Sequence, residues 1–342
     1  MNGYERTMAA LRGEPHDRVP VMLHNFMMAA REINVSMSNF REKPELIAQA
    51  FIHAVEKYGY DAVLMDVDTV TLAGSLGVPV DFPENEPARP VSGLLNSLED
   101  VKKLQPPKVE NYRYVQHWLE AVRILCQYFG NEVFIRGNCD QAPFSLASMI
   151  RGANHLMLDL FMAEPQFIVD LLNYCTEASC QLIRLMSQAG AHMVSNGDSV
   201  AGPEMIAPEQ YEEFALPYEK IVVEEAHKLG LPYALHICGN IDLILELMLK
   251  TNADAFEVDY KTDIYKAFDI LHDKATFIGN IDPSNVIALG TPDLVRRKTT
   301  ELLDIFGKTN RFILNAGCAI PSITPEENIF ALVETAKKYD LK

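Results

Sequence analysis

The sequence predicts an α/β fold in which eight parallel strands, each followed by a helix, close into a single (β/α)8 TIM barrel. Short runs of β-branched and apolar residues recur along the chain, and each run ends in polar residues or glycine. A longer segment with helical periodicity follows each run, and this alternation is typical of a parallel sheet. Eight such units suit a closed barrel better than an open sheet.

The expected strands cover residues 19–24, 62–66, 133–137, 192–196, 233–237, 255–258, 276–279 and 312–315. The expected helices between them include residues 44–58, 165–189, 208–229 and 292–306. Most of these helices begin with a proline, whose missing N–H costs nothing in the first turn. Residues 4–11 predict a further short helix that plugs the barrel floor.

We expect one domain over residues 1–342, because no repeat at solenoid periods and no low-complexity tract divides the chain. Residues 1–18 form an expected N-terminal helical extension. Residues 74–108, after the second strand, contain many prolines and alternate short apolar pieces with acidic ones. This composition predicts an excursion from the barrel, either a hairpin or a lid.

The net charge and the hydrophobicity of the chain limit which kinds of partner it can bind. The net charge is −17, from 30 basic and 47 acidic residues, so nucleic acid and anionic membrane surfaces are poor partners. No apolar run approaches the roughly 20 residues that a membrane helix needs, and the N-terminal residues lack the apolar core of a secretory signal. We therefore expect a cytoplasmic globular protein.

The six cysteines are scattered along the chain without the density of a disulfide scaffold, so we expect reduced thiols. Cys126, Cys175 and Cys180 lie in amphipathic helical stretches and are expected to be buried as small apolar residues. Cys139 ends a strand, and its role stays open. The other two cysteines lie at strand ends, where barrels of this kind place their active sites.

A histidine and two cysteines form the strongest pattern in the sequence. His236 and Cys238 are two residues apart on one strand, so their side chains point to the same side. Cys318 ends the last strand, and the fifth and eighth strand ends face each other across a barrel mouth. Two thiolates and one imidazole favour zinc, and three protein ligands leave one position for exchange, as in catalytic zinc sites.

Other interpretations of these residues remain open at the sequence level. A His-x-Cys pair on a strand is most often a packed histidine beside an inert thiol, although the neighbouring glycines would allow the backbone to bend around an ion. Glu257, on the next strand, is an expected fourth ligand until substrate displaces it. The alternative is a carboxylate that orients His236 by accepting a hydrogen bond from its other ring nitrogen. Asp259 is an alternative for either role.

This pattern resembles the zinc site of the cobalamin-dependent methyltransferases of the uroporphyrinogen decarboxylase superfamily, the branch that includes methylcobalamin:coenzyme M methyltransferases. The resemblance extends over almost the whole chain. Its landmarks are residues 6–20, 61–68, 197–199, 236–239, 279–283 and 315–318. Uroporphyrinogen decarboxylases themselves carry an arginine-rich segment after the first strand, whereas residues 24–31 here contain one arginine. Their last strand also typically ends near a histidine, where Cys318 stands.

The resemblance implies a methyltransferase that moves a methyl group between a corrinoid, carried by a separate small protein, and a small thiol or another donor or acceptor. The implied cofactors are Zn²⁺ and the methylcobalamin of that partner. The alternatives are a decarboxylase of the porphyrin type and a noncatalytic binding subunit with the same barrel. The direction of transfer and the oligomeric state are left open.

Further polar residues at strand ends complete the expected site. Asp66 matches a region where decarboxylase relatives keep a functional aspartate, although Asp68 stands beside it. Asp198 is expected either to orient substrate and move a proton or to cap a following helix. Asp66 and Asp198 are thus the candidate catalytic residues. Residues expected to contact the cofactor or shape its pocket are Asn25, Asn138, Gln141 and Asn196.

Overall fold

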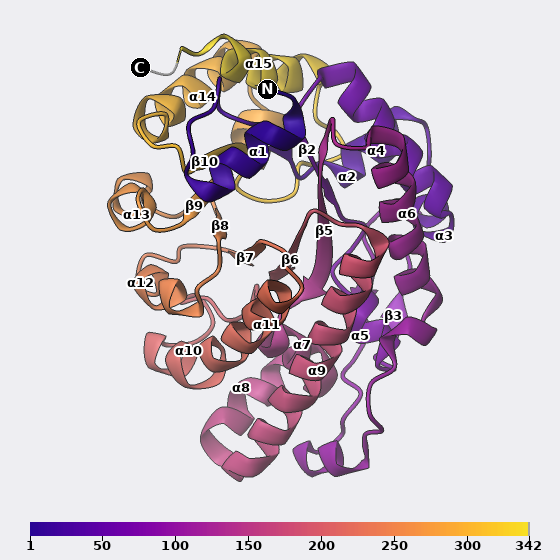
Figure 1. Ribbon diagram of the computed structural model, residues 1–342. Helices are drawn as coiled ribbons and strands as arrows, with labels where there is room; N and C mark the ends of the chain where they lie inside the picture. Colours follow the sequence, from indigo (N-terminus) through magenta and orange to yellow (C-terminus); the bar gives the residue numbers. More distant parts are fainter. Residues whose placement is uncertain (341–342) are drawn as a thin grey trace.

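Eight parallel strands form a closed barrel in a computed structural model, which describes residues 1–340 (Figure 1). The strands are β1 Met22–Leu23, β2 Ala62–Met65, β5 Phe134–Gln141, β6 Met193–Gly197, β7 Tyr233–Ile237, β8 Ala255–Val258, β9 Thr276–Ile281 and β10 Phe312–Ala316. Their order in the sheet follows the chain, and each neighbouring pair is parallel. A bridge between Val21 and Leu314 joins the first strand to the last. The predicted fold class is therefore confirmed.

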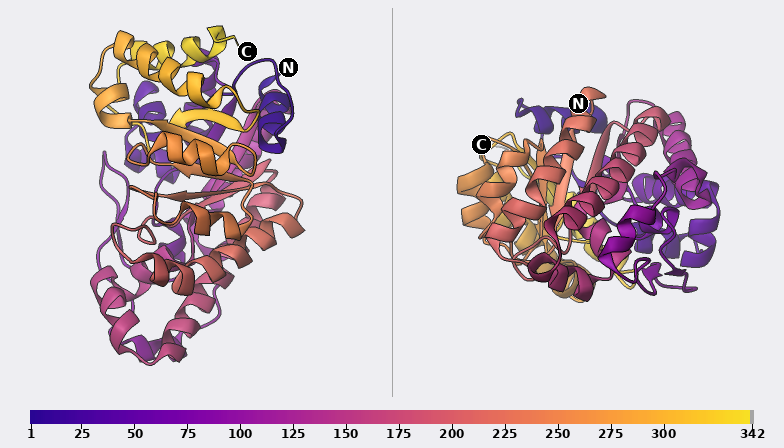
Figure 2. Two further views of the ribbon diagram at one scale, coloured as in Figure 1. Left: turned by 90° about the vertical axis from the view of Figure 1, so that its left-hand side faces the viewer. Right: turned by 90° about the horizontal axis from the view of Figure 1, so that it is seen from below.

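Helices surround the barrel (Figures 1 and 2). The longer ones are α1 Gly3–Arg12, α4 Pro44–Tyr58, α6 Arg113–Phe129, α8 Ala153–Met162, α9 Pro165–Ala189, α11 Leu216–Lys228, α14 Pro292–Phe306 and α15 Glu326–Lys338. The shorter ones are α2 Phe26–Glu32, α3 Met37–Glu42, α5 Thr71–Ser75, α7 Pro143–Arg151, α10 Pro208–Phe214, α12 Leu245–Met248 and α13 Ile264–Leu271. Short 3-10 helices occur at Leu98–Lys103, Val109–Asn111 and Leu249–Thr251, and a short π-helix occurs at Pro283–Ala288. None of the helices within residues 1–340 combines the length and apolar character needed to cross a bilayer.

The expected single helix over residues 208–229 is wrong, because the structure divides it into α10 and α11. The break lies at Ala215, two residues before Pro217. Proline has no N–H to donate, and its ring crowds the carbonyl group four residues earlier, so an unbroken helix through this point is unfavourable. Pro217 instead lies in the first turn of α11, where that donor is not needed.

Helix α1 closes the barrel floor. Asn2 caps the helix by accepting a hydrogen bond from the backbone N–H of Glu5, whose carboxylate accepts one from the N–H of Asn2. The helix packs Ala10 and Leu11 against buried side chains at the amino ends of the strands. These side chains are Met22, Ala62, Leu64, Phe134, Met193, Ala234, Ala255, Ile278 and Ile313. In both views of the molecule from the side, α1 and α15 lie at one end and α8 at the other (Figures 1 and 2).

The segment after β2 leaves the barrel. It contains a two-stranded antiparallel sheet of β3 Val80–Asp81 and β4 Arg89–Pro90. Pro87, between these two strands, lies in the wall of the cavity described below. The excursion therefore reaches the carboxyl ends of the barrel strands, and its role as a lid stays a prediction.

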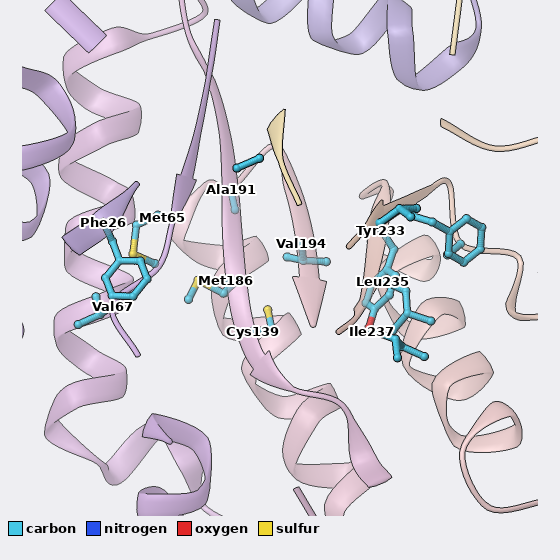
Figure 3. Close-up of a cluster of buried hydrophobic side chains, with 14 of the residues drawn as sticks. Phe26, Met65, Val67, Cys139, Met186, Ala191, Val194, Tyr233, Leu235 and Ile237 are labelled. Carbon is cyan, nitrogen blue, oxygen red and sulfur yellow. The ribbon is translucent and has the colours of Figure 1, made fainter. Parts of the chain in front are cut away.

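Cys139, whose role the sequence left open, is a buried thiol. Figure 3 shows it among apolar side chains that include Met186 and Val194. It has no exposed surface, and burial raises the pKa of its thiol. Cys139 is therefore a neutral core residue.

Candidate metal centre

His236, Cys238 and Cys318 meet at the carboxyl ends of the strands. His236 lies near the end of β7, Cys238 follows that strand, and Cys318 comes two residues after β10. Their ligand atoms all lie within 4.8 Å of one another. The Nε2 atom of His236 is 3.2 Å from Sγ of Cys238. The structure thus brings together three side chains that the sequence spreads over more than 80 positions, between 236 and 318.

The three donors fit a zinc ion. In a tetrahedral site with Zn–S near 2.3 Å and Zn–N near 2.0 Å, the donor atoms lie roughly 3.5–3.8 Å apart. The Nε2–Sγ separation of 3.2 Å between His236 and Cys238 is near these values, and no two of the three donors are more than 4.8 Å apart, so side-chain rotations would complete the geometry. The Nδ1 atom of His236 is 2.9 Å from the backbone carbonyl oxygen of Glu257, which leaves Nε2 directed at the cysteines.

Electrostatics within the cluster favour a thiolate. A hydrogen bond from Cys318, opposed by burial and reinforced by His236 and Ser199, lowers the pKa of Cys238 to about 3. The same hydrogen bond raises the pKa of Cys318. Burial lowers the pKa of His236, but the charge and hydrogen bond of Cys238 outweigh it and raise that pKa to about 10. Cys238 is therefore already in the anionic form that binds metal ions.

A cavity of about 280 Å³ opens beside these three residues. Cys238 and Cys318 are half-buried at its wall, and His236 lies deeper. Polar residues from other strand ends also line the cavity. They are His24, Asp66, Asp68, Thr69, Arg136, Asn138, Asp140, Gln141, Asn196, Ser199 and Glu257.

A row of buried ion pairs crosses the base of the cavity. The Nη2 atom of Arg136 is 2.5 Å from Oε2 of Glu257, and Nδ1 of His24 is 3.6 Å from the other oxygen of that carboxylate. On its other side, Nε2 of His24 is 2.7 Å from Oδ2 of Asp66. Arg136 was not predicted as a site residue from the sequence. The signal that could have found it is a single charged residue inside the apolar start of β5.

Glu257 lies beside the metal ligands, but its carboxylate is held elsewhere. Besides Arg136, it accepts a hydrogen bond of 3.3 Å from the side-chain amide of Asn315. It is not part of the group of close ligand atoms. The support that its carboxylate was expected to give His236 comes instead from its backbone carbonyl group. Asp259 accepts hydrogen bonds from the backbone N–H groups of Gly239 and Lys261, so it fixes the loop after β7.

The protonation of His24 follows from its two acidic neighbours. Burial alone would lower its pKa, but hydrogen bonds and charge interactions with Asp66 and Glu257 outweigh that effect and raise the pKa to about 9. His24 is therefore a cation at neutral pH. Together with Arg136, it balances the charges of Asp66 and Glu257.

Three of the four residues expected to contact the cofactor line the cavity, namely Asn138, Gln141 and Asn196. The amide of Asn196 is already satisfied, because it donates to two backbone carbonyl groups and accepts from Tyr233. Asn25 is outside the cavity lining. It is fully buried at the start of α2, so the expected contact with a cofactor is not supported.

The two candidate catalytic aspartates differ in their surroundings. Asp66 lines the cavity and bonds to His24 and Asn138. Asp198 is outside the cavity lining and has no exposed surface. Its carboxylate accepts a hydrogen bond from the backbone N–H of Ser145 in α7, and the neighbouring carboxyl group of Glu219 affects its pKa. The structure therefore places Asp198 away from the cavity wall, and its catalytic role stays a prediction.

Fold and site together define a parallel β/α barrel protein with a histidine and two cysteines gathered at the mouth of the barrel. The chain belongs to the uroporphyrinogen decarboxylase (URO-D) family, whose model matches residues 2–339. Two named relatives represent different activities. The chain is 32% identical over 342 residues to "Methylcobamide:CoM methyltransferase MtbA" of Methanosarcina acetivorans, covering 98% of this chain and 97% of that protein. It is 28% identical to "Uroporphyrinogen decarboxylase" of a Synechococcus species, covering 96% and 95%.

A solved structure supports the fold. The protein is similar to "methyltransferase from Methanosarcina mazei", with a TM-score of 0.89 and coverage of 99% of both chains at 24% identity. A second similar structure is described as a putative vitamin-B12-independent methionine synthase from Listeria monocytogenes, with a TM-score of 0.55 and 14% identity. Both similarities concern the arrangement of the barrel.

Proposed function

We propose that this protein is a zinc-dependent methyltransferase that moves a methyl group between a corrinoid, carried by a separate small protein, and a small thiol or another donor or acceptor. The observation that carries the proposal is the meeting of His236, Cys238 and Cys318 at the cavity wall. The relative named as a methylcobamide:CoM methyltransferase, similar over 98% of this chain, supports the same reaction class.

The side chains of this site would hold the metal ion and leave one position open to the cavity. When bound, zinc supplies a Lewis acid that favours the thiolate form of a coordinated thiol near neutral pH. His236 is aligned by the carbonyl group of Glu257, and Ser199 lies 3.5 Å from the sulfur of Cys238. These contacts fix two of the three donors before a substrate arrives.

The reaction is balanced without a further reactant when the thiol is the acceptor. The substrate sulfur forms a bond to the methyl carbon as the carbon–cobalt bond breaks, and the electron pair of that bond stays on cobalt. The proton of the thiol passes to solvent. The same site serves the reverse direction, in which the heteroatom of a methyl donor is the leaving group.

The cavity wall argues against decarboxylation of a porphyrin precursor. Such a substrate carries several carboxylates, which need cations. Among the residues that the structure describes, Arg136 is the only arginine in the wall, and Glu257 already pairs with it. The wall also contains four acidic residues, namely Asp66, Asp68, Asp140 and Glu257.

Metal analysis of matched variants tests the proposal. The wild-type protein is expected to bind about one zinc ion per chain, and Cys238→Ser and Cys318→Ser are expected to lose it. Cys126→Ser is the control, because that half-buried thiol lies in α6 and contacts the carbonyl group of Gly190. Zinc content that is absent from the reconstituted wild type, or equal in all four proteins, would contradict the metal site.

A demethylation assay distinguishes a methyltransferase from a noncatalytic binding subunit. The absorption spectrum of methylcobalamin is expected to change to that of demethylated cobalamin when the zinc-loaded protein and a small thiol are added. The Cys318→Ser protein provides the background rate. A zinc-loaded wild type that gives no rate above this background with any thiol or methyl donor would support the binding subunit instead.

A further inference from the structure

The cavity has two chemically different sides. One side carries the sulfur atoms of Cys238 and Cys318. The other is built by residues after β2 and at the end of β5, and it includes Asp68, Asp140 and Gln141. A small substrate whose sulfur lies at the metal ligands would direct its remaining atoms toward these polar groups.

The cations of the cavity wall are already paired. Arg136 lies against Glu257, and His24 lies between Glu257 and Asp66. His236 bonds to the sulfur of Cys238 and to a backbone carbonyl group. Within residues 1–340, no lysine and no second arginine lines this cavity. An anionic headgroup inside it would therefore lack a counter-charge, which makes its burial unfavourable.

Hydrogen-bond acceptors, by contrast, are available. Oδ1 of Asp68 accepts hydrogen bonds from the backbone of Val70 and the hydroxyl of Thr71, while its Oδ2 accepts none within the described residues. Oε1 of Gln141 and Oδ1 of Asp140 are buried without a partner, and these two residues are only 3% and 1% exposed. Burial and the neighbouring charge of Asp68 raise the pKa of Asp140 well above its ordinary value, so a cationic group that binds there would displace a proton from this carboxyl group. Unpaired buried acceptors are costly, so a ligand that donates hydrogen bonds would relieve that cost.

We infer that Asp68, Asp140 and Gln141 form a subsite for a hydrogen-bond-donating group, cationic or neutral, at the end of the substrate remote from its sulfur. The substrate class is then a small aminothiol or hydroxythiol, and an anionic thiol is disfavoured. This inference rests on the proposed function for the placement of the sulfur. It also distinguishes this chain from what the name of its CoM-dependent relative indicates, since coenzyme M is a sulfonate.

Three thiols with the same two-carbon chain test the subsite: 2-aminoethanethiol, 2-mercaptoethanol and 2-mercaptoethanesulfonate. Binding to the zinc-loaded protein is measured by titration calorimetry. The cationic thiol is expected to bind at least roughly tenfold more tightly than the sulfonate, with the neutral thiol between them. Equal or tighter binding of the sulfonate would overturn the inference, and so would no measurable binding of any of the three.

Two variants assign the preference to the subsite. Asp68→Asn keeps an oxygen to accept the hydrogen bonds from Val70 and Thr71, and Asp140→Asn suits a backbone φ of 61°, which asparagine tolerates. Both are expected to reduce the advantage of 2-aminoethanethiol over 2-mercaptoethanol several-fold, because an amide accepts a hydrogen bond but carries no negative charge. Asp293→Asn, at a side chain that is 94% exposed on α14, is the control and should change nothing. An unchanged preference in both cavity variants would contradict the assignment.

Demethylation of methylcobalamin by the same three thiols separates this inference from the proposed function. If the binding order holds but no thiol is methylated, the subsite stands and the proposed reaction fails. If thiols are methylated and the sulfonate is preferred, the proposed reaction stands and the subsite is refuted.

Discussion

Arg136 illustrates how a single side chain sets the charge balance of the site. Its guanidinium group pairs with Glu257 and donates a hydrogen bond of 2.8 Å to the hydroxyl of Ser195, and the residue is only 2% exposed. The attraction between the buried charges of Arg136 and Glu257 offsets the cost of removing both groups from water. Removing one partner leaves the other as an uncompensated buried charge.

We therefore expect Arg136→Met to lower the free energy of unfolding by about 3–5 kcal/mol. Urea denaturation of the metal-free protein measures the change. The double variant Arg136→Met with Glu257→Gln is the control, because it removes both charges and should recover most of the loss. If Arg136→Met alone is as stable as the wild type, the ion pair between Arg136 and Glu257 is not buried from water as the structure indicates.

The residues of the site differ in how far the sequence could predict them. His236, Cys238 and Cys318 were predictable, because strand alternation and the geometry of a barrel place them together. Arg136 was not, since its role depends on Glu257, which is 121 positions later in the chain. Asn25 was assigned to the cavity because it follows a strand, but a residue at a strand end can face either the cavity or the surrounding helices.

At the scale of elements, Asp198 joins the end of β6 to three helices. Its carboxylate accepts a hydrogen bond from the N–H of Ser145 in α7 and interacts with the carboxyl group of Glu219 in α11. Glu219 in turn accepts a hydrogen bond from the hydroxyl of Tyr211 in α10. Burial raises the pKa of Asp198 to about 6 and raises the pKa of Glu219 well above its usual value. Two adjacent buried carboxyl groups are thus most stable when they share a proton.

This pair predicts a pH dependence of stability. The native pair keeps a proton that the unfolded chain releases, so its stabilising contribution is complete below pH 3.8, the ordinary pKa of Asp198. The contribution falls as pH rises through about 6 and continues to fall as Glu219 titrates. Asp198→Asn should flatten this decline, because its side-chain amide can donate to Glu219 without an added proton.

The measurement is the free energy of unfolding in urea at pH 5 and pH 8. The wild type is expected to lose more stability between the two values than the Asp198→Asn variant. The exposed Asp293→Asn variant controls for the change in net charge and should behave like the wild type. Identical slopes in all three proteins would rule out the shared proton.

The elements themselves were mostly predictable. Helices α4, α9 and α14 begin and end at the expected residues, because each starts at a proline and is followed by a glycine at position 59, 190 or 307. The break between α10 and α11 was missed because the apolar periodicity continues through Pro217. The short strand β1 was overestimated at residues 19–24, where the structure gives Met22–Leu23.

For the whole molecule, the barrel floor and the metal ligands lie at opposite ends of the strands. Leu11 is 5% exposed beneath the barrel. Leu11→Ala is expected to lower the free energy of unfolding by about 2–5 kcal/mol, as for other buried leucines, while the zinc content stays at that of the wild type. Urea denaturation and metal analysis of the same preparation check both parts. Loss of zinc from a folded Leu11→Ala protein would show that the two ends are coupled.

The closure of the barrel beside β1 has a consequence for the metal ligands. That strand has two residues, and a single bridge from Val21 to Leu314 joins it to β10. The backbone N–H of His24 donates a hydrogen bond to the side-chain oxygen of Asn315, and the carbonyl group of His24 accepts one from the N–H of Ile320. These two contacts lie on either side of Cys318 in the sequence. Cys318 therefore lies next to the strand pairing with the fewest paired residues, between β1 and β10. His236 and Cys238 lie at β7, which pairs with both of its neighbours over several residues. A metal ion bound by all three residues would link β7 to β10 and would help to hold the barrel closed. Loss of the ion would then accompany any opening of the barrel between β1 and β10.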